Sequence, residues 1–104
     1  MIGSRLTKKF LILDFWFLSC IPCIRDHKEV LSNLRILDEK NAEMVSISTD
    51  KDLEKWRNYV LKNRYVWRNY QQPGAATLTR DLSISTFPNY IILNSDNEVL
   101  SIIN

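Results

Sequence analysis

The sequence has no apolar run long enough to cross a membrane. Its most apolar stretch, residues 10–18, is interrupted by Asp14 and falls well short of the roughly 20 residues that a membrane-spanning helix needs. The first five residues have neither the apolar stretch nor the small-residue cleavage site of a secretion signal. The sequence therefore predicts no transmembrane segment and gives no direct indication of the compartment.

Charge of one sign is also scarce. The 14 Lys and Arg residues against 12 Asp and Glu residues leave a net charge of +2, and the basic residues are scattered. Nucleic acids and anionic membranes are bound by clustered basic residues. The aromatic and basic stretch from Trp56 to Tyr70 has the residue types that stack single-stranded bases, but its spacing favours the core and rim of a helix. We expect no nucleic-acid partner.

Metal ligands are few as well. A zinc site needs four ligands, and beyond Cys20 and Cys23 only His27 is an obvious third. A metal site is therefore disfavoured. His27 is interpreted as a surface or boundary residue of a helix; alternatively it tunes the cysteines, because it lies four residues after Cys23 on the same helix face.

What is present is the composition of one globular domain spanning residues 1–104, with 45% hydrophobic and 25% charged residues. Hydrophobic periodicity, caps and turn residues predict its elements in chain order. They are a doubly buried strand at 10–15, an amphipathic helix at 21–40, a strand at 44–48, a helix capped within 49–52 with residues 53, 56 and 60 on one face, a connection at 63–74 ending in a Pro73-Gly74 turn, a short helix at 77–82, and a hairpin with strands at 89–93 and 99–103.

This order predicts an α/β fold, with a central mixed β-sheet flanked by helices and the early strands paired in parallel. The chain stops at Asn104, at the end of the last predicted strand. We therefore expect a domain truncated at the C-terminus, with an apolar sheet face that needs a further helix or a second copy of the chain to cover it. Self-association through this face is one expectation of the sequence.

The two cysteines are three residues apart, where the first strand ends and the first helix begins. The positive end of a helix and its free N–H groups stabilise a thiolate, which is the species that attacks disulfides. This position predicts that Cys20 is the nucleophile and that Cys23, one turn further in and more shielded, resolves the mixed disulfide. A purely structural disulfide is the alternative, but closing so short a loop adds little stability.

The stretch from Asp14 through Trp16 to Cys20-Ile21-Pro22-Cys23 resembles the active-site segment of the thioredoxin superfamily, and residues 84–93 are similar to the segment with that family's cis-proline. The longer middle segment, residues 45–67, resembles the TlpA/ResA-like branch of thiol:disulfide oxidoreductases. The resemblance spans residues 9–103. It implies a thioredoxin-like fold and no cofactor other than a redox-active Cys20–Cys23 disulfide.

The resemblance also implies roles for four further residues. Pro88 would sit beside Cys20 with a cis bond after Phe87, and the adjoining backbone would receive an extended segment of the substrate. Asp14 would be the buried carboxylate that relays a proton to or from Cys23; the alternative is a strand-end aspartate with local hydrogen bonds. Trp16 would pack near the disulfide among the substrate-binding residues, although an aromatic side chain there is equally a core residue.

The expected function is therefore thiol:disulfide oxidoreduction on protein thiols and disulfides, with an upstream electron donor. Likeness to the TlpA/ResA-like branch implies a bacterial periplasm or cell-envelope location. Two other functions stay open. One is a peroxiredoxin-like peroxidase, although Phe17 stands where that branch usually has Thr or Ser. The other is a non-catalytic binding module with the same fold.

Overall fold

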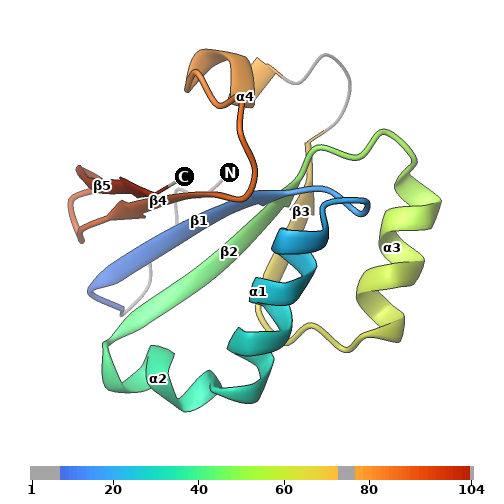
Figure 1. The fold of residues 1–104 in the computed structure, drawn as a ribbon. Helices are drawn as coiled ribbons and strands as arrows, with labels where there is room; N and C mark the ends of the chain where they lie inside the picture. Colours follow the sequence, from blue (N-terminus) through green and yellow to red (C-terminus); the bar gives the residue numbers. More distant parts are fainter. Residues whose placement is uncertain (1–7, 73–76, 104) are drawn as a thin grey trace.

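The structure, a computed structural model, describes residues 8–72 and 77–103. Its centre is strand β1 (Phe10–Trp16), which pairs in parallel with β2 (Ala42–Ser48) and antiparallel with β4 (Asn89–Leu93). The sheet has five strands in the order β3 (Arg68–Gln71), β2, β1, β4 and β5 (Val99–Ile103) (Figure 1). The predicted mixed sheet is confirmed. The central position of β1 explains its nearly continuous apolar sequence, because both of its faces are covered.

The two faces of the sheet differ in chemistry. One face has the main apolar core, which Ile84, Phe87 and Leu93 also contact; its buried members are Leu11, Leu13, Phe15, Val45, Ile47 and Ile91. Successive side chains of a strand point to opposite faces. Asp14 and Trp16 therefore face the other side of the sheet. Helices α1 (Ile21–Ser32) and α3 (Leu53–Lys62) lie on that side, and α4 lies on the side of the main apolar core (Figure 1).

The first helix is shorter than predicted. A single helix was expected over 21–40, but the structure has α1 ending at Ser32 and a separate α2 at Leu34–Glu39. Asn33 lies between them with φ −136°, outside the helical range, and its side-chain amide donates to the carbonyl of Glu29 at 3.0 Å. Such side-chain bonds to the backbone compete with helix continuation, so the break occurs at an asparagine.

Helix α3 begins where its caps predict. Asp52 is the N-cap, and its carboxylate accepts a hydrogen bond from the N–H of Lys55 at 3.0 Å. Trp56 and Val60 pack towards the disulfide, as their shared face predicts. Leu53, predicted on the same face, is 45% exposed. It is the first residue of the helix.

One strand was missed. The region 63–74 was interpreted as a connection, yet Arg68–Gln71 forms β3, which pairs in parallel with β2. This is an edge strand with alternating exposed and half-buried residues, so its sequence lacks the apolar pattern of a buried strand. The predicted turn at Pro73–Gly74 lies outside the described residues.

The last elements agree with the sequence. The short helix α4 (Thr77–Asp81) and the hairpin of β4 and β5 (Val99–Ile103) are present. In the turn of the hairpin, Asn97 has a φ of 63°, a left-handed conformation that asparagine tolerates. No helix among the described residues has the length and apolar character needed to cross a bilayer.

Strand β5 forms an exposed edge of the sheet. Every residue of β5 is exposed, and Ile102 is 59% exposed. Beside it, an open groove of about 330 Å³ runs between α1, α2 and the hairpin, with Val30, Ile92 and Ile103 among its lining residues. Strand β5 and this groove lie where the sequence predicts an uncovered sheet face; the truncation and the association through this face stay predictions.

We expect concentration-dependent self-association through β5, because an apolar edge strand is a template for pairing. Ile102→Lys should raise the dissociation constant by about tenfold, since losing one apolar anchor costs on the order of 1.4 kcal/mol. Size-exclusion chromatography with light scattering measures this. Leu61→Lys, at an exposed position on α3, is the control. A monomer at every concentration would contradict the expectation.

Candidate active site

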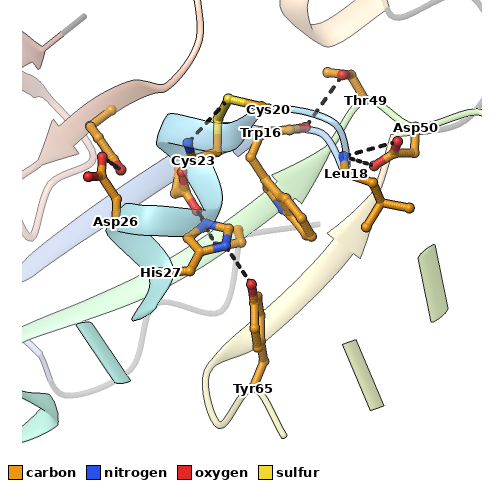
Figure 2. Close-up of a disulfide and its surroundings, with 12 residues drawn as sticks. Trp16, Leu18, Cys20, Cys23, Asp26, His27, Thr49, Asp50 and Tyr65 are labelled. Atoms are coloured by element: carbon orange, nitrogen blue, oxygen red, sulfur yellow. Dashed lines mark hydrogen bonds and ion pairs between the residues drawn. A yellow bond between two sulfur atoms is a disulfide. The ribbon is translucent and has the colours of Figure 1, made fainter. Parts of the chain in front are cut away.

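Cys20 and Cys23 form a disulfide at the start of α1 (Figure 2). Cys20 is the N-cap residue, and its Sγ accepts a hydrogen bond from the N–H of Cys23 at 3.3 Å. Cys20 is 5% exposed and Cys23 is 0% exposed. The predicted pairing and the predicted difference in shielding are both present, so a partner can approach the disulfide only at Cys20.

Apolar side chains surround the disulfide at the surface. Ile21, between the cysteines, is 71% exposed. Phe17 and Phe87 pack against the cluster that contains Cys20 and Cys23, and their rings meet edge to face at 5.3 Å. The side of the molecule that presents Cys20 is therefore apolar rather than charged.

The bond between Phe87 and Pro88 is cis, as the resemblance implied. Phe87 also contacts the main apolar core on the opposite face of the sheet. It therefore connects the two packing layers just before β4 begins. The contribution of Pro88 to a substrate groove stays a prediction.

Trp16 lies behind the disulfide. It is 0% exposed and belongs to the buried cluster with Cys20 and Cys23, so the expected packing near the disulfide is present. Its ring also meets His27 edge to face, with centroids 4.7 Å apart. In this oxidised state Trp16 offers no surface to a substrate, and any effect on binding would act through the residues it supports.

Asp14 is a fully buried carboxylate in the middle of β1. Its Oδ2 lies 2.6 Å from His27 Nε2 and accepts a hydrogen bond from the hydroxyl of Ser46 at 2.5 Å. Its Oδ1 is buried and has no hydrogen-bond partner among the described residues. The burial is as the resemblance implied, whereas the role in proton relay stays a prediction.

His27 is not the surface residue that the sequence suggested. Its side chain is 0% exposed, because α1 turns this position towards the sheet, as it does Cys23 one turn earlier (Figure 2). Its Nε2 faces Asp14 and its Nδ1 lies 2.8 Å from the hydroxyl of Tyr65. The four-residue spacing indicated that His27 shares a helix face with Cys23. It supported the alternative interpretation, in which His27 tunes the cysteines.

The sequence did not single out Tyr65 and Tyr59. Tyr65 follows α3 and reaches back to His27, and its hydroxyl donates to that of Tyr59 at 3.3 Å. Burial, followed by the hydrogen bond with Tyr59, raises the pKa of Tyr65 above its ordinary value of 10.0. Burial and the bond to Asp26 raise the pKa of Tyr90 in the same way. Both phenols are therefore neutral at physiological pH.

Asp50 belongs to the predicted capping segment 49–52, in which Asp52 is the cap of α3; Asp50 itself anchors the loop before Cys20. Its carboxylate accepts from the N–H of Leu18 at 3.0 and 3.2 Å, and from the hydroxyl of Ser48 at 2.5 Å (Figure 2). The N–H of Thr49 donates to the carbonyl of Trp16 at 2.9 Å. The residues that follow β2 thus fix the loop that precedes Cys20.

A family profile described as thioredoxin-like matches residues 8–99. The chain belongs to the thioredoxin-like family. Within residues 8–72 and 77–103, this thioredoxin-like domain has no group of three or more His, Cys, Asp or Glu side chains placed to hold a metal ion. The redox group that the described residues contain is the Cys20–Cys23 disulfide.

Three solved structures with the same fold are thiol-disulfide oxidoreductases or StoA. The protein from Bacteroides fragilis is 24% identical, with a TM-score of 0.79 over 98% of this chain and 77% of that one. StoA from Bacillus subtilis is 17% identical, with a TM-score of 0.78 over 94% and 75%. The thioredoxin domain from Bacteroides vulgatus is 20% identical, with a TM-score of 0.78 over 92% and 70%. The predicted fold is confirmed.

A curated relative is the chloroplastic protein SUPPRESSOR OF QUENCHING 1 of Arabidopsis thaliana. The two sequences are 30% identical over 103 residues, which cover 89% of this chain. The matched region is 9% of the length of the plant protein. The likeness therefore concerns one domain of a much longer protein.

Asp50→Ala should lower the free energy of unfolding by about 1–3 kcal/mol, because the N–H of Leu18 loses its acceptor in a partly buried site. It should also change the rate at which thiols attack the disulfide. Asp52→Ala is the matched control: loss of the α3 cap should cost about 1 kcal/mol and leave the attack rate unchanged. Urea unfolding and thiol-reduction kinetics measure the two effects, and equal attack rates in both variants would contradict the anchoring role.

The raised pKa values of Tyr65 and Tyr90 predict a loss of stability at alkaline pH. Below pH 10 both phenols are protonated in the folded and the unfolded chain. Above it, the unfolded chain loses protons that the folded chain keeps, so the free energy of unfolding falls as pH rises. Ultraviolet titration of tyrosinate should show two late-ionising groups, one of which is lost in Tyr65→Phe and one in Tyr90→Phe. Four tyrosines titrating together in the folded protein would contradict this assignment.

Proposed function

We propose that this thioredoxin-like domain is a thiol:disulfide oxidoreductase that acts on protein thiols and disulfides through Cys20 and Cys23. The observation that supports it most directly is the asymmetry of the pair at a helix N-terminus. Cys20 is the N-cap residue and the more exposed of the two sulfurs, while Cys23 is fully buried. A helix N-terminus favours a thiolate at Cys20, and burial protects Cys23 from external disulfides.

The chemistry of the reduced pair follows from this arrangement. The Cys20 thiolate attacks one sulfur of a substrate disulfide, and the other substrate sulfur leaves as a thiolate with the electron pair of the broken bond. Cys23 loses its proton and attacks Cys20. This restores the Cys20–Cys23 disulfide and releases the second substrate sulfur as a thiolate. The substrate gains two electrons, and an upstream thiol donor must return them to the domain.

Asp14 is the proposed proton acceptor for Cys23. The carboxylate contacts His27 of α1 through Oδ2, and its Oδ1 has no hydrogen-bond partner among the described residues. A base in such a position removes the proton of the Cys23 thiol as it becomes a nucleophile. Between turnovers the same carboxylate is held by Ser46 and His27.

The proposed substrate surface is the apolar rim around Cys20. Ile21 is exposed beside the nucleophile, and Phe87 leads through a cis bond to Pro88 and then into β4. The backbone at Pro88 is the proposed docking strip for an extended substrate segment. Apolar side chains next to the substrate disulfide would pack on Ile21 and Phe87.

Two alternatives are separable by experiment. A peroxiredoxin-like peroxidase would consume hydrogen peroxide, and a binding module would not reduce disulfides at all.

The likeness to bacterial oxidoreductases supports the envelope location, while the curated relative is a chloroplast protein. The location, the electron donor and self-association through β5 therefore stay predictions.

The first test is the reduction of insulin disulfides by the wild type, Cys20→Ser and Cys23→Ser. Cys20→Ser should lose activity, since the nucleophile is gone. Cys23→Ser should attack once and accumulate a mixed disulfide at Cys20, visible by mass, because no resolving thiol remains. Equilibration against glutathione buffers then gives the potential, and every 30 mV corresponds to about 1.4 kcal/mol.

The oxidoreductase function would be contradicted if wild-type Cys20 and Cys23 did not interconvert between dithiol and disulfide at any glutathione redox potential. That result would favour the binding module. Peroxide consumption at a rate exceeding disulfide reduction would favour the peroxidase. A mixed disulfide that forms in Cys20→Ser rather than in Cys23→Ser would reverse the assigned roles of the two cysteines.

A further inference from the structure

We propose that His27, Tyr65 and Tyr59 form a proton path that connects the buried Asp14 carboxylate with solvent during each redox cycle. The inference rests on the proposed function, since it concerns the proton that Cys23 gives up when the disulfide forms. Figure 2 shows the middle of this path, with Tyr65 bonded to His27 below Cys23.

The need for a path arises from the burial of Asp14. Its side chain is 0% exposed, and so is that of Cys23. A proton that moves from Cys23 to Asp14 can return to the Cys23 thiolate unless it is passed on, so onward transfer determines how much thiolate is available to attack Cys20. Among the described residues, the side chains that hydrogen-bond to Asp14 are Ser46 and His27, so these are the two candidate exits.

The Ser46 branch is closed. The hydroxyl of Ser46 donates its proton to Asp14 and accepts one from the indole N–H of Trp67 at 2.8 Å. Indole nitrogen is a donor without acceptor capacity, so it can take no proton from Ser46. This branch therefore holds Asp14 in place and ends at Trp67.

The His27 branch is open. Imidazole has two nitrogens, so a proton can enter at one while another leaves from the other. Nε2 lies 2.6 Å from Asp14 Oδ2, and Nδ1 lies 2.8 Å from the hydroxyl of Tyr65. A neutral His27 that receives a proton from Asp14 on Nε2 can release the one on Nδ1 to Tyr65.

The two tyrosines continue the path outwards. A phenolic hydroxyl both donates and accepts, and Tyr65 donates to Tyr59 at 3.3 Å. Both rings are only half-buried, whereas Asp14 and His27 are fully buried. Because burial raises the pKa of Tyr65, its hydroxyl stays protonated and passes a proton on by accepting one and donating another.

Other titratable groups lie near the pair. On α1 these are Cys23 and the half-buried Asp26. On β4, Tyr90 is paired in register with Asp14, and its hydroxyl donates to Asp26 at 2.6 Å. Because that hydroxyl proton is directed to Asp26, Tyr90 is assigned no part in the path. It serves as the matched control.

The step balances as a net release of one proton. Cys23 S–H gives its proton to Asp14, and the Cys23 thiolate forms the bond to Cys20 as the substrate sulfur leaves with its electron pair. The proton on Asp14 passes to His27 Nε2, the proton on Nδ1 passes to Tyr65, and a hydroxyl proton leaves through Tyr59 to water. Reduction of the disulfide runs the same transfers in reverse.

The test separates the two sulfur steps with the aromatic disulfide DTNB. Reduced protein mixed rapidly with DTNB releases one aromatic thiolate when Cys20 attacks and a second when Cys23 resolves the mixed disulfide. His27→Gln keeps a polar side chain beside Asp14, but an amide cannot take up one proton and release another. Tyr65→Phe keeps the ring packing and removes the hydroxyl. The variants to compare with wild type are His27→Gln, Tyr65→Phe and Tyr90→Phe.

We expect both relay variants to leave the first phase unchanged and to slow the second by about tenfold or more near neutral pH, the range of general acid–base effects. The difference should vanish at alkaline pH, where hydroxide takes the Cys23 proton directly. The second phase of Tyr90→Phe should match wild type. A purely structural role would instead alter both phases, with no convergence at high pH.

Three results would overturn the path. The first is a second phase in His27→Gln and Tyr65→Phe equal to that of wild type at neutral pH. The second is slowing that Tyr90→Phe shows and Tyr65→Phe does not, which would direct the proton through Asp26. The third is a wild-type protein without a second phase, which would overturn the oxidoreductase as well. The first two leave the proposed function intact, so the two failures are distinguishable.

Discussion

A carboxylate in the middle of a central strand has to find its hydrogen bonds inside the protein, and the rest of the site is arranged around that requirement. Burying an unpaired charge is costly, so each partner of Asp14 is tightly placed. Ser46 approaches from the neighbouring strand in register, and His27 approaches from α1. The second contact fixes the rotation of α1 about its own axis. That rotation turns Cys23 inward, one turn before His27, and leaves Cys20 at the helix start.

Aromatic side chains on the same face of the sheet pack around the Asp14–His27 pair. Trp16, His27, Tyr65 and Trp67 form a chain of ring contacts, with centroids 4.7 to 5.7 Å apart, between the disulfide and the edge of the sheet. The aromatic stretch from Trp56 to Tyr70 was interpreted as the core and rim of a helix, whereas Tyr65 and Trp67 lie between α3 and β3. In the fold these rings surround the buried Asp14–His27 pair and exclude water from it.

Much of this was predictable because it depends on local pattern. The doubly buried β1, the cysteines at a strand-to-helix boundary and the terminal hairpin all follow from periodicity and turn residues. Three features did not follow. The break at Asn33 depends on one side-chain bond to the backbone, and the polar edge strand β3 depends on pairing with β2. The burial of His27 depends on a carboxylate 13 residues away. Contacts between distant segments leave no periodic trace in the sequence.

The attachment of the cysteine loop to β3 has a consequence for dynamics. Asp50, which holds the N–H of Leu18 through its carboxylate, accepts a bond from the side-chain amide of Gln71 through its own carbonyl at 2.7 Å. Edge strands and their bonds open at lower free energy than a central strand. Fraying of β3 would therefore loosen the loop before Cys20, while β1 and the Asp14–His27 contact stay intact. The Cys20 sulfur would thus fluctuate with an edge strand of the sheet, and the Asp14 carboxylate with the central strand.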